Sequence, residues 1–257
     1  MPADNSIYDT QASGWWDENN FLHILKTGLN PVRFEYFQTI LNHQGLKLPE
    51  LNVLDIGCGG GILSEEFARM GCAVRGIDIS ASSVSIALKH ARNDRLKIEY
   101  QVGSALALPF STASFDVVVC CDVLEHLPDL TAAIAEAARV LKPGGTFLFD
   151  TINRTLRSFF ETILIAQELP LTRFFAPGSH DWHQFIHPHQ LEGCFKLHQL
   201  ALGEFRGLQS GISPLVTALQ IFRLKLGQIN FAEFGKRLSF HIGDSLDSSY
   251  IGYALKT

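Results

Sequence analysis

A glycine-rich turn that follows a short apolar run constrains this chain most. Residues 53–56 have the apolar character of a buried strand, four of the five residues at 57–61 are glycine, and a helical pattern begins at Ile62. Glycine lacks a Cβ and adopts positive φ, so such a turn lets the backbone approach a ligand closely. The order strand, glycine turn, helix is typical of βαβ units that bind nucleotide-like molecules.

Strands and helices alternate over residues 52–150. The pattern predicts strands at 52–56, 72–77, 96–102, 115–121 and 146–150, and helices at 61–70, 81–92 and 129–141. This alternation predicts an α/β fold with a parallel sheet and helices on both faces.

The 257 residues are sufficient for one domain, which we divide into three parts. Residues 1–45 form an N-terminal helical arm with a helix at 31–44, 50–150 form the cofactor-binding core, and 151–257 form an acceptor-side region. A helix at 188–195 and strands at 197–204 and 249–256 are expected in this last region. Residues 207–246 could not be placed, apart from a helical pattern at 214–226.

Composition narrows the classes of partner and compartment. The formal net charge of −5 argues against a general nucleic-acid partner. Five cysteines without a Cys-x-x-Cys pair are typical of reduced intracellular thiols. Residues 1–6 lack the features of a secretory signal, and no apolar run is long enough to span a bilayer. We therefore expect a cytoplasmic protein; the sequence does not determine its oligomeric state.

The residues around the glycine turn indicate the kind of ligand. Asp78 follows Gly57 by 21 residues and ends the second predicted strand, where a carboxylate can accept hydrogen bonds from both ribose hydroxyls. The third glycine of a dinucleotide motif is absent, and two glutamates in the first helical turns would repel a pyrophosphate. A cationic nucleoside without phosphate suits the turn better. Asp55 would add negative charge for it, or would simply be a hydrogen-bonded residue at the end of a strand.

Four stretches resemble the class I S-adenosylmethionine-dependent methyltransferases. They are residues 53–61, 76–78, 107–116 and 141–145. The resemblance implies a Rossmann-like, mostly parallel sheet of seven strands, the last of them antiparallel, with S-adenosylmethionine as cofactor.

Five further stretches resemble the O-methyltransferases of ubiquinone biosynthesis. They are residues 12–17, 29–33, 121–126, 151–158 and 178–186, in that order. The resemblance covers about residues 8–205 and implies methylation of a phenol or catechol hydroxyl on a polyprenylated quinone precursor. After Gly207 this chain carries additional residues. A methyltransferase with a different small-molecule acceptor, or a non-catalytic, lipid-associated protein that binds the cofactor, therefore stays open.

The resemblance also implies roles for individual residues. Arg33 would contact the methionine carboxylate of the cofactor, for which a bidentate guanidinium is suited. Cys121 would lie near the cofactor or be a buried packing residue, and Ser104 stands where many relatives have an aspartate that contacts adenine. The complete predicted cofactor-binding set is Arg33, Asp55, Gly57, Gly59, Asp78, Ile79, Ser104 and Cys121.

A second group of polar residues follows the fourth predicted strand. Asp122, Glu125 and His126 have the spacing of residues on one side of a helical turn. The resemblance implies that they bind Mg²⁺, which prefers few protein ligands. Alternatively, His126 takes the phenol proton as general base, with Glu125 as a second catalytic residue. A third alternative is a purely structural role.

Three other features could belong to the acceptor side. The apolar segment 156–176 is either a helix packed in the core or, as the resemblance implies, an insertion that contacts the membrane surface, flanked by Arg154, Arg157 and Arg173. The histidines of 180–189 lack the spacing of a zinc site, so we expect a lid over the acceptor. Trp15 and Trp16 either pack an arm on the core or cap a site.

Overall fold

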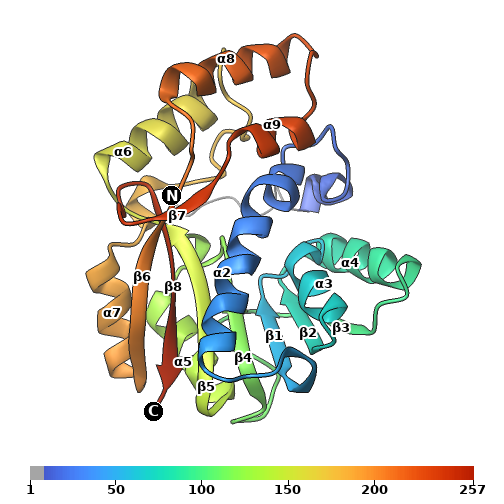
Figure 1. Cartoon of the computed structure of the whole chain (residues 1–257), viewed down its shortest axis with the longest axis vertical. Helices are drawn as coiled ribbons and strands as arrows, with labels where there is room; N and C mark the ends of the chain where they lie inside the picture. The colour runs from blue at the N-terminus through green and yellow to red at the C-terminus, as the bar shows by residue number, and fades with distance from the viewer. Residues whose placement is uncertain (1–8) are drawn as a thin grey trace.

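A mixed eight-stranded sheet forms the centre of the protein (Figure 1). The computed structural model describes residues 9–257, without the side chain of Pro214, so the first eight residues of the predicted N-terminal arm lie outside the described part. The strand order is β3-β2-β1-β4-β5-β8-β6-β7. The strands are β1 (Asn52–Ile56), β2 (Ala73–Asp78), β3 (Ile98–Val102), β4 (Phe115–Cys120), β5 (Leu141–Ile152), β6 (Leu200–Gln209), β7 (His241–Gly243) and β8 (Ser249–Lys256).

Strands β1 to β5 run parallel, and β8 runs antiparallel to both β5 and β6. The predicted Rossmann-like sheet and its antiparallel strand are confirmed. The number of strands is eight rather than seven because β7 pairs antiparallel with the end of β6. A strand of three residues is too short to show alternation in the sequence.

Helices cover both faces of the sheet, as expected. The helices are α2 (Asn30–His43), α3 (Ile62–Arg69), α4 (Ala81–Asn93), α5 (Leu130–Val140), α6 (Leu156–Ser158), α7 (Pro188–Leu197), α8 (Pro214–Lys225) and α9 (Phe231–Arg237). One core places α5 and α7 against Val118 and Phe147, and a second places α2 and α3 against Val117 and Val119. Successive residues of β4 thus face opposite sides, as a pleated strand requires.

Shorter helical segments connect these elements. They are η1 (Ala12–Gly14), η2 (Leu25–Leu29), η3 (Leu48–Glu50), η4 (Leu124–His126), η5 (Phe159–Glu168) and η6 (Trp182–Gln184). The segment η5 continues α6 directly, so the apolar stretch predicted at 156–176 is helical only as far as Glu168.

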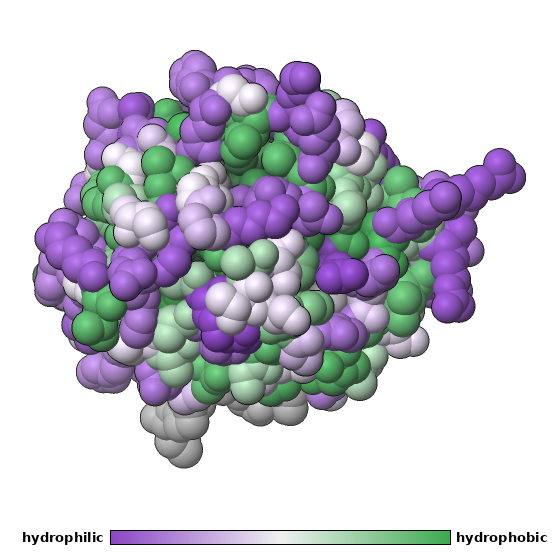
Figure 2. Space-filling view, turned by 90° about the horizontal axis from the view of Figure 1, so that it is seen from below, coloured by the Kyte–Doolittle hydropathy of each residue, from purple (hydrophilic) through white to green (hydrophobic). Residues whose placement is uncertain are grey.

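Residues 210–240, the middle of the stretch 207–246 that the sequence did not place, form a lobe above the sheet. Helices α8 and α9 lie in this lobe beside α6 and η5 (Figure 1). A separate small core holds it together, with Ile221 and Phe234 packed against Ile24 of the N-terminal arm and Ile165 of η5. The opposite end of the molecule presents mixed hydrophilic and hydrophobic residues (Figure 2). Among residues 9–257, no helix is both long and apolar enough to cross a membrane.

Candidate active site

A cavity of about 230 Å³ opens at the carboxyl ends of β1, β2 and β4. Open α/β sheets bind their ligands at this edge. Most of the predicted site residues line it: Arg33, Asp55, Gly57, Asp78, Ile79, Ser104, Cys121, Asp122 and His126. Gly59 and Glu125 lie behind the wall. We call this cavity the cofactor pocket.

The glycine turn adopts a backbone that needs glycine. Gly57, Gly59 and Gly61 have φ values of +70°, +50° and +84°. A Cβ on Gly59 would lie 2.4 Å from the ring of Trp15, closer than side chains can approach. The N–H of Gly59 donates a 2.8 Å hydrogen bond to the carboxylate of Asp78. Gly59 therefore holds Asp78 in place. It contributes to ligand binding through Asp78 and does not line the pocket itself.

Two carboxyl groups give the pocket its negative character. Asp78 accepts a second hydrogen bond, of 2.8 Å, from the N–H of Ser80, and burial raises its pKa. Asp55 is buried, and the hydroxyl of Ser64 donates to it at 2.5 Å. Burial raises the pKa of Asp55 to about 7. Asp55 is thus both a hydrogen-bonded residue at the end of a strand and part of the pocket wall, so the two alternatives from the sequence are combined.

The paired tryptophans close the glycine turn from the N-terminal arm. The indole of Trp15 lies over Gly59 and Gly60 and donates to the hydroxyl of Ser83 at 3.0 Å. Trp16 donates to the carbonyl of Gly60 at 2.9 Å, and its ring stacks on His90 at 3.3 Å between centroids. The arm therefore both packs on the core and forms a wall of the cofactor pocket.

Arg33 lies at the centre of a buried ionic cluster. Its guanidinium donates to Asp122 at 2.6 Å and to the side chain of Asn30 at 2.6 Å, and it pairs with Asp150 through Nε. The surrounding carboxylates outweigh the cost of burial and raise the pKa of Arg33 further above its usual value. Asp150, which the sequence analysis did not select, also accepts the backbone N–H of Asp122 at 3.0 Å.

Asp122 has an unusual backbone for an aspartate. Its φ of +54° lies in the left-handed region, where non-glycine residues are uncommon. This conformation accompanies the turn that leaves β4 and the ion pair of its carboxylate with Arg33. Such strain is often found at functional sites.

Glu125 and His126 belong to the short segment η4 and are both buried. Glu125 accepts a 2.8 Å hydrogen bond from the hydroxyl of Thr151, and burial raises its pKa to about 8. Burial lowers the pKa of His126 to about 4. At neutral pH Glu125 is therefore protonated and His126 is neutral, so of the two His126 can accept a proton.

His180 is the member of the histidine-rich stretch that approaches the pocket. Its ring centroid lies 5.1 Å from that of His126 and 4.8 Å from that of Phe175. Burial, together with the neighbouring His126, lowers its pKa to about 3. His180 thus lies beside His126, which is on the wall of the cofactor pocket, and the lid over the acceptor stays a prediction.

The predicted magnesium ligands do not fit a magnesium site in this arrangement. The carboxylate of Asp122 is paired with Arg33, that of Glu125 accepts the hydroxyl of Thr151, and His126 offers nitrogen to an ion that prefers oxygen. Among residues 9–257, the ligand atoms that lie within 4.8 Å of one another belong to a different group, namely Glu65, His90 and Asp94. The magnesium site stays a prediction, and no chemical step below uses it.

Known proteins resemble the chain over nearly its whole length. It is 35% identical over 240 residues to a ubiquinone biosynthesis O-methyltransferase of Nitrosococcus oceani, with 92% of this chain and 95% of the relative covered. A protein of the same name from Hahella chejuensis is 33% identical over 250 residues, with 97% and 92% covered. The chain belongs to this family of O-methyltransferases. A family model described as a methyltransferase domain matches residues 54–149.

Solved structures support the fold of this methyltransferase. A possible histamine N-methyltransferase of Thermotoga maritima aligns with a TM-score of 0.61 at 17% identity, covering 98% of both chains. A SAM-dependent methyltransferase of Aquifex aeolicus aligns with a TM-score of 0.59 at 14% identity, covering 97% of this chain and 98% of that one. The predicted fold and cofactor class are confirmed: the protein is an S-adenosylmethionine-dependent O-methyltransferase.

The cofactor pocket has the chemistry that S-adenosylmethionine requires. Asp78 suits the ribose hydroxyls, and the two buried carboxyl groups suit a positively charged sulfonium. Trp15 and Asn30 also line the pocket, although neither was in the predicted cofactor-binding set. The sequence pointed to Trp15 only through its pairing with Trp16, and it contained no signal for Asn30. In this structure Arg33, the predicted partner of the methionine carboxylate, is already paired with Asp122 and Asp150.

Proposed function

We propose that this methyltransferase acts on a hydroxyl group of a phenol or catechol ring in a polyprenylated quinone precursor. The observation that carries the proposal is the position of His126, whose imidazole lies on the wall of the cofactor pocket where an acceptor hydroxyl would need to lose its proton. The names of the relatives support the substrate class, since they are called ubiquinone biosynthesis O-methyltransferases.

The residues of the chain have separate roles in this reaction. S-adenosylmethionine, when bound, supplies a methyl group on a positively charged sulfur. Asp78 would hold the ribose and Arg33 would hold the methionine carboxylate, while His126 accepts the proton of the acceptor hydroxyl at a ring nitrogen. Holding acceptor and methyl group in a near-attack geometry can contribute about 7–11 kcal/mol to catalysis.

Methyl transfer to demethylated quinol analogues tests this function. Wild type should methylate a prenylated catechol, and His126→Ala should lower turnover about 10²- to 10⁴-fold while cofactor affinity stays nearly constant. His189→Ala, which removes an exposed histidine, is the matched control. Running each assay with and without Mg²⁺ tests the metal prediction separately. Wild-type turnover in His126→Ala would contradict the role of this residue, and no transfer to any phenol by wild type would contradict the function.

We also propose that the lobe above the sheet contacts a membrane surface, where such a lipophilic acceptor resides. Leu156, Phe160 and Leu171 of the predicted segment 156–176 are 72%, 52% and 87% exposed, so these side chains are not packed in the core. Exposed apolar side chains of this kind can enter the boundary between headgroups and acyl chains. Of the flanking arginines, Arg154 and Arg157 already have partners within the chain.

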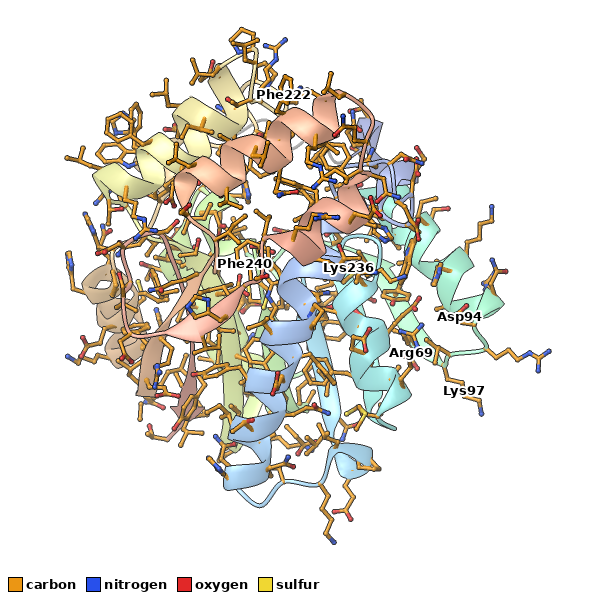
Figure 3. The ribbon with its side chains drawn as sticks, turned by 45° about the horizontal axis from the view of Figure 1, so that its top comes forward. Arg69, Asp94, Lys97, Phe222, Lys236 and Phe240 are labelled. Atoms are coloured by element: carbon orange, nitrogen blue, oxygen red, sulfur yellow. The ribbon has the colours of Figure 1, made fainter. Side chains whose placement is uncertain are left out.

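Helix α8 adds to this apolar surface. Leu215, Leu219 and Phe222 follow one another at helical spacing and are 85%, 54% and 60% exposed. Figure 1 shows α8 beside α6, and Figure 3 labels Phe222 on α8. The exposed apolar residues therefore come from two neighbouring helical stretches.

Co-sedimentation with anionic phospholipid vesicles tests the membrane contact. The double variant Phe160→Asp/Leu171→Asp and the variant Phe222→Asp should each lower the bound fraction. Leu197→Asp, which changes a leucine of α7 that is 67% exposed, should bind as wild type does. Equal binding by all four proteins would rule out this surface.

A further inference from the structure

A second cavity, of about 660 Å³, lies under the lobe. Three separate parts of the chain form its walls: the N-terminal arm, residues 173–177, and residues 224–231. Its apolar lining residues are Phe21, Phe174, Phe175, Ala176, Pro177, Leu224, Ile229 and Phe231. Arg173 and Lys225 also line it, and the ammonium group of Lys225 donates to the carbonyl of Arg173 at 2.8 Å. We call it the aromatic cavity.

A continuous series of rings connects the aromatic cavity with the cofactor pocket. His126 lines the cofactor pocket, and the centroid of its ring lies 5.1 Å from that of His180. The ring of Phe175, which lines the aromatic cavity, lies 4.8 Å beyond His180. From Phe175 the series continues to Phe174 at 4.6 Å and to Phe21 at 5.8 Å. The linings of the two cavities have no residue in common, but this row of contacting rings leads from one to the other, with the proposed proton acceptor at one end.

We propose that the aromatic cavity binds the polyprenyl tail of the methyl acceptor while the ring of the acceptor lies at His126. This inference rests on the proposed function and specifies where the tail lies. The row of rings that leads from this cavity to His126 favours the acceptor's own tail over an unrelated lipid. The volume of about 660 Å³ lies within the range of ~300–1,000 Å³ that is usual for sites of small molecules. The aromatic and aliphatic part of the lining suits an apolar chain, while the polar side chains of Gln11, Asn19 and Asn230 also line the cavity.

The same cavity gives residues 207–246 a role in specificity. One wall, from Leu224 to Phe231, is formed by the end of α8, the start of α9 and the loop between them. Phe231 begins α9 and lies 6.5 Å, between ring centroids, from Phe174. The end of the tail would therefore contact this wall, which sets the length of tail that the cavity accepts.

A series of catechols with no, one, two or three isoprene units tests this proposal. Wild-type kcat/KM should rise with each unit added. Phe231→Ala should remove one wall and lower kcat/KM for the longest acceptor about ten- to one-hundred-fold, the value of burying one large apolar side chain. Ala176→Phe should fill part of the cavity, exclude the tail from it and lower kcat/KM for the longest acceptor by a similar factor. For the acceptor without a tail, both variants should act as wild type, which also shows that they fold.

Leu197→Ala is the matched control, because it removes a leucine of α7 that is 67% exposed, does not line the cavity and is not part of the proposed membrane surface. It should keep the wild-type dependence on tail length. The same dependence in all four proteins would overturn the proposal and leave the proposed function intact. Loss of the dependence in Leu197→Ala alone would place the tail outside the cavity and also overturn it. If no catechol of any tail length were methylated by wild type, the proposed function itself would fail.

Discussion

Replacing Glu125 by glutamine is expected to make the protein more resistant to unfolding as the pH rises. Glu125 is 2% exposed, and the hydroxyl of Thr151 donates to it at 2.8 Å. Burial, and after it the nearby charge of Asp122, raises the pKa of Glu125 from 4.5 to about 8. Glutamine has nearly the same shape and can still accept the hydrogen bond from Thr151, but it cannot ionise.

The size of the effect follows from proton linkage. Between pH 4.5 and 8 the folded protein keeps the Glu125 proton, whereas the unfolded chain releases it. The contribution of Glu125 to the free energy of unfolding is therefore fully present below pH 4.5 and is lost as the pH rises through 8. The slope is about 1.4 kcal/mol per pH unit, so the total loss is about 5 kcal/mol. Glu125→Gln should not show this loss.

The measurement is guanidinium unfolding of both proteins at several pH values between 5.5 and 7.5. The free energy of unfolding of Glu125→Gln minus that of wild type should rise by about 3 kcal/mol across this range. Any constant cost of the substitution cancels, because only the change with pH is compared. Glu99→Gln, at a side chain that is 76% exposed, should change stability by less than about 1 kcal/mol throughout. A difference between Glu125→Gln and wild type that stays flat with pH would refute the reasoning.

Three further substitutions test the construction of the cofactor pocket. Gly59→Ala places a Cβ 2.4 Å from the ring of Trp15, so the Kd for S-adenosylmethionine should rise about ten-fold or more by calorimetry; an unchanged Kd would contradict the close approach. Arg33→Met leaves the buried carboxylate of Asp150 and the partly exposed carboxylate of Asp122 without their cation and should lower the free energy of unfolding by about 3–5 kcal/mol; stability within 1 kcal/mol of wild type would contradict a coupled cluster. Trp15→Ala should weaken cofactor binding more than Trp182→Ala, measured by the same titration, because only Trp15 lines the pocket; equal effects would contradict its role as a wall.

The sheet and the cofactor pocket could be predicted because their signals are local. The apolar strands and the glycine turn each lie within a few residues of the structure that they determine. Parallel strands place their carboxyl ends at one edge, so residues that follow β1, β2 and β4 had to meet there. For this reason Gly57, Asp78 and Cys121 line one pocket although they are far apart in the sequence.

The charge partners in the pocket could not be predicted in the same way. The sequence places Asp122 near other acidic and histidine ligands, but Arg33 reaches it from α2, 89 residues away. Asp150 enters the same cluster from the end of β5. These ion pairs form because α2 passes the edge of the sheet where Asp122 and Asp150 lie. The helical periodicity of the sequence predicts the helix but not its position relative to the sheet.

The lobe above the sheet was beyond prediction for a related reason: the contact that fixes it has no local signal. Gly28 of η2 and Gly235 of α9 are 207 residues apart, yet a Cβ on Gly28 would lie 2.9 Å from the carbonyl oxygen of Gly235. A Cβ on Gly235 would in turn lie 2.4 Å from the hydroxyl of Thr27. Each glycine alone is merely an unfavourable residue within a helix, where it costs about 1 kcal/mol relative to alanine. Only together do they allow the two helical segments to touch, and this contact brings the N-terminal arm beside residues 224–231 to enclose the aromatic cavity.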